Sequence, residues 1–209
     1  MHFLCRCGKM VAENFGLEKD MNCYDFDKTI YKSDSSCDFY LFCLKRYPAV
    51  IKHWPAQLGA LIRHYVFHSI SKTAMKEVFY RYFREISDMQ AALSEFWAAH
   101  LHKVKDFYKA QQQPEDVIIS ASPEFFLKPA CEALGIVHLI ASPVNKKTGA
   151  YEGENCHGKE KVRRFRALFP EAEVDAFYSD SLSDTPMAEL SKDAYLVKGD
   201  SIMPWPEKV

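Results

Sequence analysis

Long apolar runs are missing from this sequence of 209 residues. A transmembrane helix needs about 18 or more consecutive apolar residues, and no stretch of that length occurs, so no membrane-spanning helix is predicted. Residues 1–20 also lack the apolar segment and the small-residue cleavage site of a secretory leader. We expect them to form a loose extension, translated from a start codon upstream of Met21.

A disulfide framework and an excess of charge are also absent. The seven cysteines are scattered and odd in number, which favours buried or free thiols in a reducing cytoplasm. Cys5 and Cys7 are separated by one residue, which is not zinc-finger spacing. The net charge is −1, so no general attraction to nucleic acid is expected. A composition of 48% hydrophobic and 26% charged residues is typical of a globular protein.

Residues 22–30 contain two carboxylates one position apart, at the end of a short apolar run. Side chains alternate along a strand, so Asp25 and Asp27 are expected on one face, with Phe26 turned toward apolar neighbours. Ligands of open α/β sheets bind at the carboxyl ends of strands. Two close carboxylates repel unless a cation or a shared proton intervenes, and Mg²⁺ suits such oxygen ligands. An aspartate beside it can attack phosphorus. A polar strand end or an Asx turn is the alternative interpretation.

Residues 34–113 are interpreted as an α-helical insertion, rich in aromatic and basic side chains. Apolar residues there recur at helical spacing, which predicts about four helices. Asp34 or a neighbouring serine is expected to cap the first of these helices. The core is expected to consist of residues 21–33 and 114–209.

Strand and helix patterns alternate after the insertion. Apolar runs predict strands at 117–120, 137–141, 174–178 and 194–197, and helical patterns predict helices at 123–134, 158–168 and 185–190. The glycine-containing segment 143–157 predicts a small hairpin or flap. This alternation predicts an α/β fold with a parallel sheet and right-handed crossovers.

Two further candidate groups are Ser120 and Lys161. Ser120 follows a predicted strand just before a helix, where a hydroxyl and backbone amides can bind an anion; the alternative is that Ser120 or Ser122 caps that helix. Lys161 lies near a helix start, where it opposes the helix dipole and gains from an anionic partner. We prefer it to Lys159 because the apolar face of the helix begins directly after it.

Asp180 and Asp184 follow the apolar run 176–178 and precede a predicted helix. Two acids in such a loop can complete an oxygen-rich Mg²⁺ site. A helix cap is the alternative interpretation for Asp184. Each polar cluster therefore lies at the carboxyl end of a predicted strand.

In this order the four clusters resemble the motifs of the haloacid dehalogenase-like hydrolase superfamily. Asp25-Phe26-Asp27-Lys28-Thr29 is similar to motif I, Ser120 to motif II, Lys161 to motif III and Asp180-Ser181-Leu182-Ser183-Asp184 to motif IV. The insertion after motif I resembles the cap of the phosphoserine-phosphatase-like branch (subfamily IB). The resemblance implies a Rossmann-like three-layer sandwich with a central parallel sheet and an α-helical cap inserted after the first strand.

The resemblance also implies roles for the residues of the first motif. Asp25 would be the nucleophile and a Mg²⁺ ligand. Asp27 would be the acid and base, and its backbone carbonyl would bind the metal. Thr29 would brace the loop between them.

The other three motifs would complete the site in the same way. Ser120 would hold the phosphoryl group, and Lys161 would balance the charge between Asp25 and the phosphate. Asp180 would bind Mg²⁺, and Asp184 would orient the waters of the metal. The expected metal set is therefore Asp25, Asp27, Asp180 and Asp184.

The expected function is Mg²⁺-dependent hydrolysis of a small phosphorylated metabolite through an aspartyl-phosphate intermediate. Lys28, Ser179, Ser183 and Ser120-Ala121-Ser122 depart from the phosphoserine phosphatase pattern, which argues against phosphoserine as the substrate. A phosphotransferase on the same scaffold is one alternative. A non-enzymatic binding protein is disfavoured because all four clusters are present, and a dehalogenase because it needs no Mg²⁺.

The stretch 47–65 combines apolar residues with basic ones such as Lys52 and Arg63. Such a stretch can lie at a membrane surface, which would suit a phospholipid-type substrate resembling phosphatidylglycerophosphate. We favour instead a cap packed by its own aromatic residues, and so do not favour a peripheral membrane contact. The pattern indicates no particular oligomeric state.

Overall fold

The computed structural model describes residues 21–206, so the predicted loose extension, residues 1–20, lies outside the described part. Six strands form one sheet in the order β3-β2-β1-β4-β5-β6, and every neighbouring pair is parallel except β5 with β6. The strands are β1 (Met21–Tyr24), β2 (Val117–Pro123), β3 (His138–Ser142), β4 (Val174–Ser179), β5 (Ser191–Lys198) and β6 (Ser201–Pro204).

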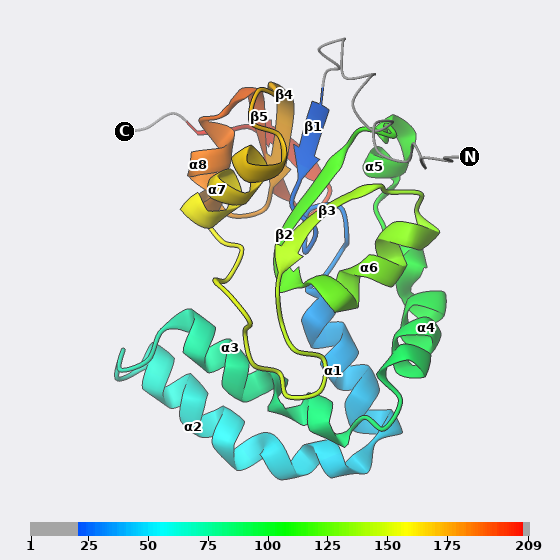
Figure 1. The fold of residues 1–209 in the computed structure, drawn as a ribbon, viewed down its shortest axis with the longest axis vertical. Coiled ribbons are helices and arrows are strands. Elements are labelled where there is room, and N and C mark those ends of the chain that lie inside the picture. Colours follow the sequence, from blue (N-terminus) through cyan, green and yellow to red (C-terminus); the bar gives the residue numbers. More distant parts are fainter. Residues whose placement is uncertain (1–20, 207–209) are drawn as a thin grey trace, which may run out of the picture.

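Helices cover both faces of this sheet (Figure 1). They are α1 (Ser35–Arg46), α2 (Trp54–Tyr65), α3 (Lys72–Tyr80), α4 (Met89–His100), α5 (Asp106–Gln111), α6 (Glu124–Ala133), α7 (Lys159–Leu168) and α8 (Thr185–Ala188). One layer contains α7 and α8, and the opposite layer contains α4, α5 and α6. This three-layer α/β arrangement, with helices inserted after β1, confirms the predicted fold class.

Strand residues alternate between two apolar cores, one on each face of the sheet. Cys23 of β1 belongs to the core beneath α7 and α8, and its neighbour Tyr24 belongs to the opposite core. In β2, Val117 and Ile119 face the first core and Ile118 faces the second. Both faces of the inner strand β2 are therefore buried at residues 117–119, which explains why this run is continuously apolar rather than alternating.

The insertion divides into two parts by what it contacts. Helices α2 and α3 pack along each other in the lower part of Figure 1, away from the sheet. Helix α4 instead packs on α6, where Trp97 Nε1 donates to the carbonyl of Phe126 at 2.8 Å. In α5, Gln111 donates to the hydroxyl of Tyr24 in β1 at 3.0 Å. The second part of the insertion thus shares the core of the sheet. Helices α2 and α3 lie farther from it, although Tyr80 at the end of α3 reaches the same core.

Side-chain caps begin three of the inserted helices. Asp34 accepts the amide of Cys37 at 2.9 Å, which confirms the cap predicted for α1. Ser71 caps α3 and Asp88 caps α4 in the same way. These short polar residues accept a backbone amide that the helix itself leaves unpaired.

The carboxyl-terminal edge of the sheet differs from the prediction. Strand β5 is longer than the predicted 194–197, and β6 returns antiparallel to it after Gly199, whose φ is +59°. The extra residues were not predicted because the start of β5 is polar and β6 is a four-residue segment, Ser-Ile-Met-Pro, whose two large apolar residues are adjacent and do not alternate with polar ones. Among residues 21–206, no helix combines the length and apolarity that crossing a membrane would require.

Candidate active site

The chain leaves β1 in a tight loop that carries Asp25 and Asp27. The amide of Asp25 donates to the carbonyl of Tyr178 at 2.9 Å, so the parallel pairing with β4 continues one residue beyond the strand. The carbonyl of Phe26 accepts the amide of Ile30 at 3.1 Å and closes the loop. The Phe26 side chain is fully buried, as predicted. Both carboxylates therefore lie at the carboxyl end of an inner strand.

Lys161, in the first turn of α7, connects the first cluster to the last. Its Nζ atom donates to Oδ1 of Asp25 and to Oδ2 of Asp184, each at 2.7 Å. Burial alone would lower the pKa of Lys161, but the charges of the two aspartates outweigh it and hold that pKa above its usual value. Burial, helped by the charges of Asp184 and Asp27, raises the pKa of Asp25 to about 7 against the effect of Lys161. One ammonium group is thus shared by two buried carboxylates.

Asp27 is held at both carboxylate oxygens. The amide of Ser35, at the start of α1, donates to Oδ1 at 2.6 Å, and the hydroxyl of Ser122 donates to Oδ2 at 2.6 Å. Burial, helped by the charge of Asp34, raises the pKa of Asp27 to about 6 against the effect of these hydrogen bonds. A carboxyl group with a pKa close to neutrality can both give and take a proton.

The loop after β4 is tied to the loop after β1. The amide of Asp180 donates to Oγ1 of Thr29 at 2.9 Å, and the Thr29 hydroxyl lies 3.5 Å from Oδ2 of Asp25. The hydroxyl of Ser179 donates to Oδ2 of Asp184 at 2.8 Å. Asp184 immediately precedes α8 but makes no capping hydrogen bond through its side chain. Its carboxylate is instead committed to the site.

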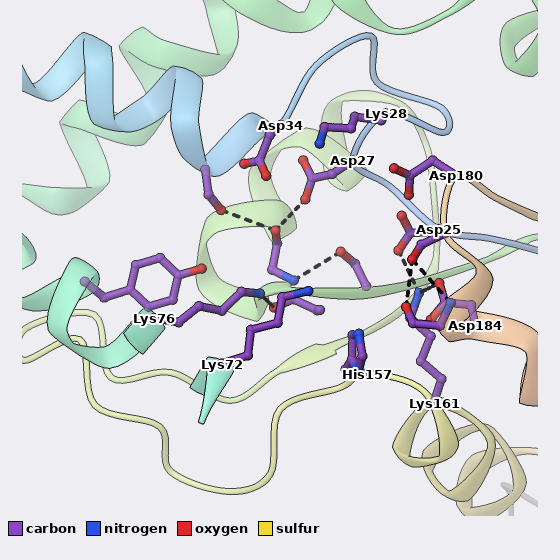
Figure 2. Close-up of a pocket in the computed structure, with 17 residues that line it drawn as sticks. Asp25, Asp27, Lys28, Asp34, Lys72, Lys76, His157, Lys161, Asp180 and Asp184 are labelled. Atoms are coloured by element: carbon purple, nitrogen blue, oxygen red, sulfur yellow. Dashed lines mark hydrogen bonds and ion pairs between the residues drawn. The ribbon is translucent and has the colours of Figure 1, made fainter. Parts of the chain in front are cut away.

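These loops line one cavity of about 270 Å³. Figure 2 shows the acids on one side of this cavity and Lys72, Lys76 and His157 on another. The cavity brings together all six predicted site residues, namely Asp25, Asp27, Ser120, Lys161, Asp180 and Asp184. The insertion closes it through α3, where Lys76 Nζ donates to the carbonyl of Ala121 at 3.2 Å. Burial lowers the pKa of Lys76.

Ser120 is buried and lies within β2, which is longer than the predicted strand 117–120. The pairing of β2 with β3 shifts register between Ile119 and Pro123, and the chain stays extended up to α6. The Ser120 hydroxyl accepts the amide of Ser122 at 3.2 Å. The residue at the cap position of α6 is Pro123, and no side chain caps that helix. The helix-cap interpretation of the two serines is therefore not observed.

The segment 143–157 forms the predicted flap between β3 and α7. A bridge between Val144 and Tyr151 closes it. The flap contacts α3, because the amide of Tyr151 donates to Glu77 at 2.9 Å. Gly149, with φ of +76°, lies against the backbone of Tyr80, which also lines the cavity. The flap thus joins the insertion to the sheet edge.

Comparison with known proteins assigns a family to this fold and site. The sequence profile described as "haloacid dehalogenase-like hydrolase" matches residues 23–189, which include all four clusters. The chain belongs to the haloacid dehalogenase-like hydrolases. The resemblance seen in the motifs is therefore confirmed.

Solved structures share the fold of this hydrolase. A Bordetella pertussis protein of unknown function superposes with a TM-score of 0.64 at 20% identity, covering 84% of this chain and 88% of that one. A phosphoserine phosphohydrolase-like protein of Francisella tularensis gives a TM-score of 0.53 at 19% identity, covering 84% and 85%. At these identities the likeness extends to the fold alone.

Curated relatives match over a shorter region. A probable phosphatase of Mycobacterium tuberculosis is 34% identical over 105 residues, which cover 43% of this chain and 36% of the relative. The matches to the first curated relatives span 36% of the length of those proteins. The chain and these relatives therefore match over a segment of each.

The donor set of this hydrolase fits a hard divalent cation. Asp25, Asp27, Asp180 and Asp184 offer only oxygen ligands, which Mg²⁺ prefers. Oδ1 of Asp184 is buried without a hydrogen-bond partner, and burial raises the pKa of Asp180. Within residues 21–206 no three His, Cys, Asp or Glu side chains already surround a common point, and two of the four acids pair with Lys161. The cavity is lined by five aspartates and four lysines, so its carboxylates outnumber its ammonium groups by one.

Some residues of the site were missed in the sequence. Ser122 holds Asp27, although only Ser120 was assigned to the site. The spacing of Ser120 and Ser122 could have indicated this, because residues two apart on an extended chain share a face. Lys72 and Lys76 are four apart on α3 and share a face of it. No local pattern indicates that this face, rather than another, would close the cavity.

Proposed function

We propose that this hydrolase cleaves phosphomonoesters in a Mg²⁺-dependent reaction with Asp25 as nucleophile. The observation that carries the proposal is the pair of buried carboxylates in one cavity, each held differently. Asp25 is bound by Lys161 at 2.7 Å, and Asp27 is bound by Ser122 and Ser35 at 2.6 Å. One acid is thus placed beside a positive charge, and the other is placed to exchange a proton.

The reaction has two displacement steps. A carboxylate oxygen of Asp25 attacks phosphorus, the bond from phosphorus to the ester oxygen breaks, and Asp27 donates its proton to that leaving oxygen. Water then attacks the aspartyl-phosphate, Asp27 takes a proton from the water, and inorganic phosphate leaves with Asp25 restored. Lys161 balances negative charge on the phosphoryl oxygens.

Asp25, Asp180, Asp184 and the backbone carbonyl of Asp27 would hold the Mg²⁺ ion. When bound, the ion supplies Lewis-acid stabilisation of charge on the phosphoryl group. Ser120 lies in the same cavity and would hold a phosphoryl oxygen. The excess carboxylate of the site supports this assignment, because a cation would neutralise it.

A small phosphorylated metabolite in the cytoplasm is the substrate class that we propose. The cavity of about 270 Å³ suits a small molecule, and the partial match to a probable phosphatase supports the phosphoryl chemistry. The five cysteines of the described part, Cys23, Cys37, Cys43, Cys131 and Cys156, are free thiols, which agrees with a reducing compartment.

The test is a panel of phosphomonoesters assayed with Mg²⁺ and with EDTA. We expect phosphate release that requires Mg²⁺ and falls at least about a thousandfold in Asp25→Asn. Asp106→Asn is the matched control, because Asp106 is an exposed residue of α5 outside the cavity. Unchanged turnover in Asp25→Asn would refute the proposal.

Product analysis separates hydrolysis from phosphotransfer. In a hydrolase, phosphate appears in equal amount to the alcohol released. A phosphotransferase would release the alcohol without free phosphate when a suitable acceptor is present. Mass spectrometry of protein quenched during turnover should locate the phosphoryl group on Asp25.

A further inference from the structure

Helix α2 and the turn after it expose large apolar side chains that contact no other part of the described chain closely enough to bury them. Trp54, Leu58, Ile62 and Tyr65 are spaced by four, four and three residues, so they share one face of α2. Their exposed fractions range from 41% for Ile62 to 63% for Tyr65, and Phe67 follows with 68%. We call these five residues the α2 face.

The aromatic residues of the insertion therefore do not all pack inside it. Phe39, Tyr82, Phe83 and Phe96 form the buried cluster expected of a self-packed cap. The α2 face points away from that cluster, since the buried residues of α2 are Gln57 and Ala60. Helix α2 lies at the outer edge of the molecule in Figure 1, with α3 between it and the sheet. A contiguous apolar face of this kind marks an interaction surface.

The chain around the α2 face is rich in basic residues. The sequence has no Asp or Glu from residue 39 to residue 76, but it has six Lys or Arg and three His there. Glu85 from outside this stretch pairs with Lys52 and His53. Arg63 and Lys72, which flank the exposed end of α2, have no ion pair with any carboxylate of the described residues. The occupant of this face is therefore expected to be apolar and anionic.

We propose that the α2 face docks the protein on an anionic lipid surface. A short helix with apolar and aromatic side chains on one side and basic side chains beside them lies in the membrane interface, and each basic residue near anionic lipid adds to the binding. The face supplies a tryptophan and a tyrosine, whose rings favour the headgroup level. The proposal concerns binding alone and does not depend on the phosphatase activity.

A second copy of the chain is a poorer occupant of this face. A symmetric dimer places the same patch of each copy against itself. The basic residues of both copies would then share one interface, with no acid between residues 39 and 76 of either copy to offset them. Like charges brought together in this way oppose association.

Docking would bring the cavity close to the lipid headgroups. The chain turns at His68, whose φ is +48°, and enters α3 after the Ser71 cap. The first residue of α3 is Lys72, which lines the catalytic cavity. Phe67 of the α2 face and Lys72 of the cavity wall are thus five positions apart in the sequence.

Co-sedimentation with vesicles tests the proposal. We use phosphatidylcholine vesicles with and without phosphatidylglycerol, at low and at high salt. The wild-type protein should sediment with the anionic vesicles at low salt, and this binding should weaken at high salt. The double substitution Leu58→Glu with Tyr65→Glu should weaken it at least about tenfold, and Arg63→Glu at least about fivefold.

The matched control is Leu168→Glu, because Leu168 is also an exposed leucine, with a fraction of 62%, but it ends α7 and is not part of the α2 face. It should bind vesicles as the wild type does. Circular dichroism melts establish that every variant is folded. The proposal is overturned if the wild type does not sediment, if it binds neutral and anionic vesicles equally, or if Leu168→Glu weakens binding as much as the α2 double variant.

Light scattering after size exclusion tests the alternative occupant, a second copy of the chain, by measuring the oligomeric state. A wild-type monomer at micromolar concentration agrees with lipid docking. A wild-type dimer that becomes monomeric in the α2 double variant would overturn the proposal, because the face would then be an interface between copies of the chain.

Discussion

The Nζ atom of Lys161 lies 2.7 Å from Oδ1 of Asp25, although 136 positions separate the two residues in the sequence. The same atom lies 2.7 Å from Asp184. Lys161 is only 1% exposed, so neither partner can be replaced by water without rearrangement. This contact joins α7, the loop after β1 and the loop after β4 into one unit. It therefore couples the stability of the fold to the charge state of the site.

Replacing Lys161 with methionine should destabilise the protein as well as inactivate it. Two buried carboxylates would lose their cation, which typically costs about 3–5 kcal/mol in the free energy of unfolding. Mg²⁺ should restore part of the loss, because it supplies positive charge to the same acids. Urea denaturation with Mg²⁺ and with EDTA measures both effects. Lys159→Met is the control, since Lys159 is exposed on the same helix; equal stability of the two variants would contradict the prediction.

Replacing Ser122 with alanine should impair catalysis with little effect on folding. The variant loses the 2.6 Å hydrogen bond that holds one oxygen of Asp27. A proton donor that is no longer fixed reaches its geometry less often, so we expect kcat to fall by about tenfold or more. Steady-state kinetics with a soluble phosphomonoester measures this. Ser191→Ala removes a hydroxyl of β5 that donates to Ala188 and should leave kcat unchanged; a similar kcat in both variants would argue against the role of Ser122.

Gly149 and Gly135 provide a matched pair that separates backbone strain from contact with the cap. Both have positive φ, +76° and +71°. A Cβ at Gly149 would clash with the carbonyl oxygen of Tyr80, whereas nothing lies within 4 Å of a Cβ at Gly135. Gly135→Ala should cost about 1–2 kcal/mol of the free energy of unfolding, and Gly149→Ala about 1–3 kcal/mol more.

The same pair should differ in kinetics. Pushing the flap away from Tyr80 disturbs a residue that lines the cavity, so Gly149→Ala should raise KM while Gly135→Ala should not. Thermal melts and steady-state assays of the two variants are sufficient. If the two alanine variants match in both measurements, the flap does not support the cavity wall.

The contribution of Glu160 to stability should depend on pH. A hydrogen bond from Arg163, aided by Arg164, lowers the pKa of Glu160 from 4.5 to about 2. A carboxyl group whose pKa is lower in the folded state stabilises the fold above its unfolded pKa and loses that effect as the pH falls through the folded value. The stabilisation is therefore complete above about pH 4.5 and disappears toward pH 2.

Glu160→Gln should consequently lower Tm at pH 7 more than at pH 3. Scanning calorimetry of both proteins across this range gives the difference directly. Glu132→Gln is the control, because Glu132 is exposed on α6, and at pH 7 it should lower Tm less than Glu160→Gln does. If the Tm difference between the wild type and Glu160→Gln grew as the pH fell, the ion pair would not stabilise the fold as predicted.

Local patterns were sufficient for most of the fold. The apolar β-branched run at residues 117–119 and the alternation of strand and helix periods after it predict the parallel sheet, because each period reflects which faces of an element are buried. The cap at Asp34 was likewise readable from neighbouring residues. Strand β6 was not, because its four residues are ordered by pairing with β5 and show no alternation of apolar and polar side chains.

In the candidate site, too, local patterns predict some features and not others. The motif order placed Asp25, Asp27 and Lys161 in one site, and the cavity contains all three. The hydrogen bond from Ser122 to Asp27 spans 95 positions, and no local pattern specifies such a contact.

The sequence alone determined the order of strands and helices, the chemistry of the four polar clusters and the family to which they belong, since these depend on residue type and short-range spacing. Only the tertiary structure decided that α2 turns its apolar face outward, that α3 brings Lys72 and Lys76 to the cavity, and that one buried lysine serves two aspartates. The physical reason is that periodicity shows that a helix has an apolar face, whereas the partner of that face is chosen by packing between segments far apart in the chain.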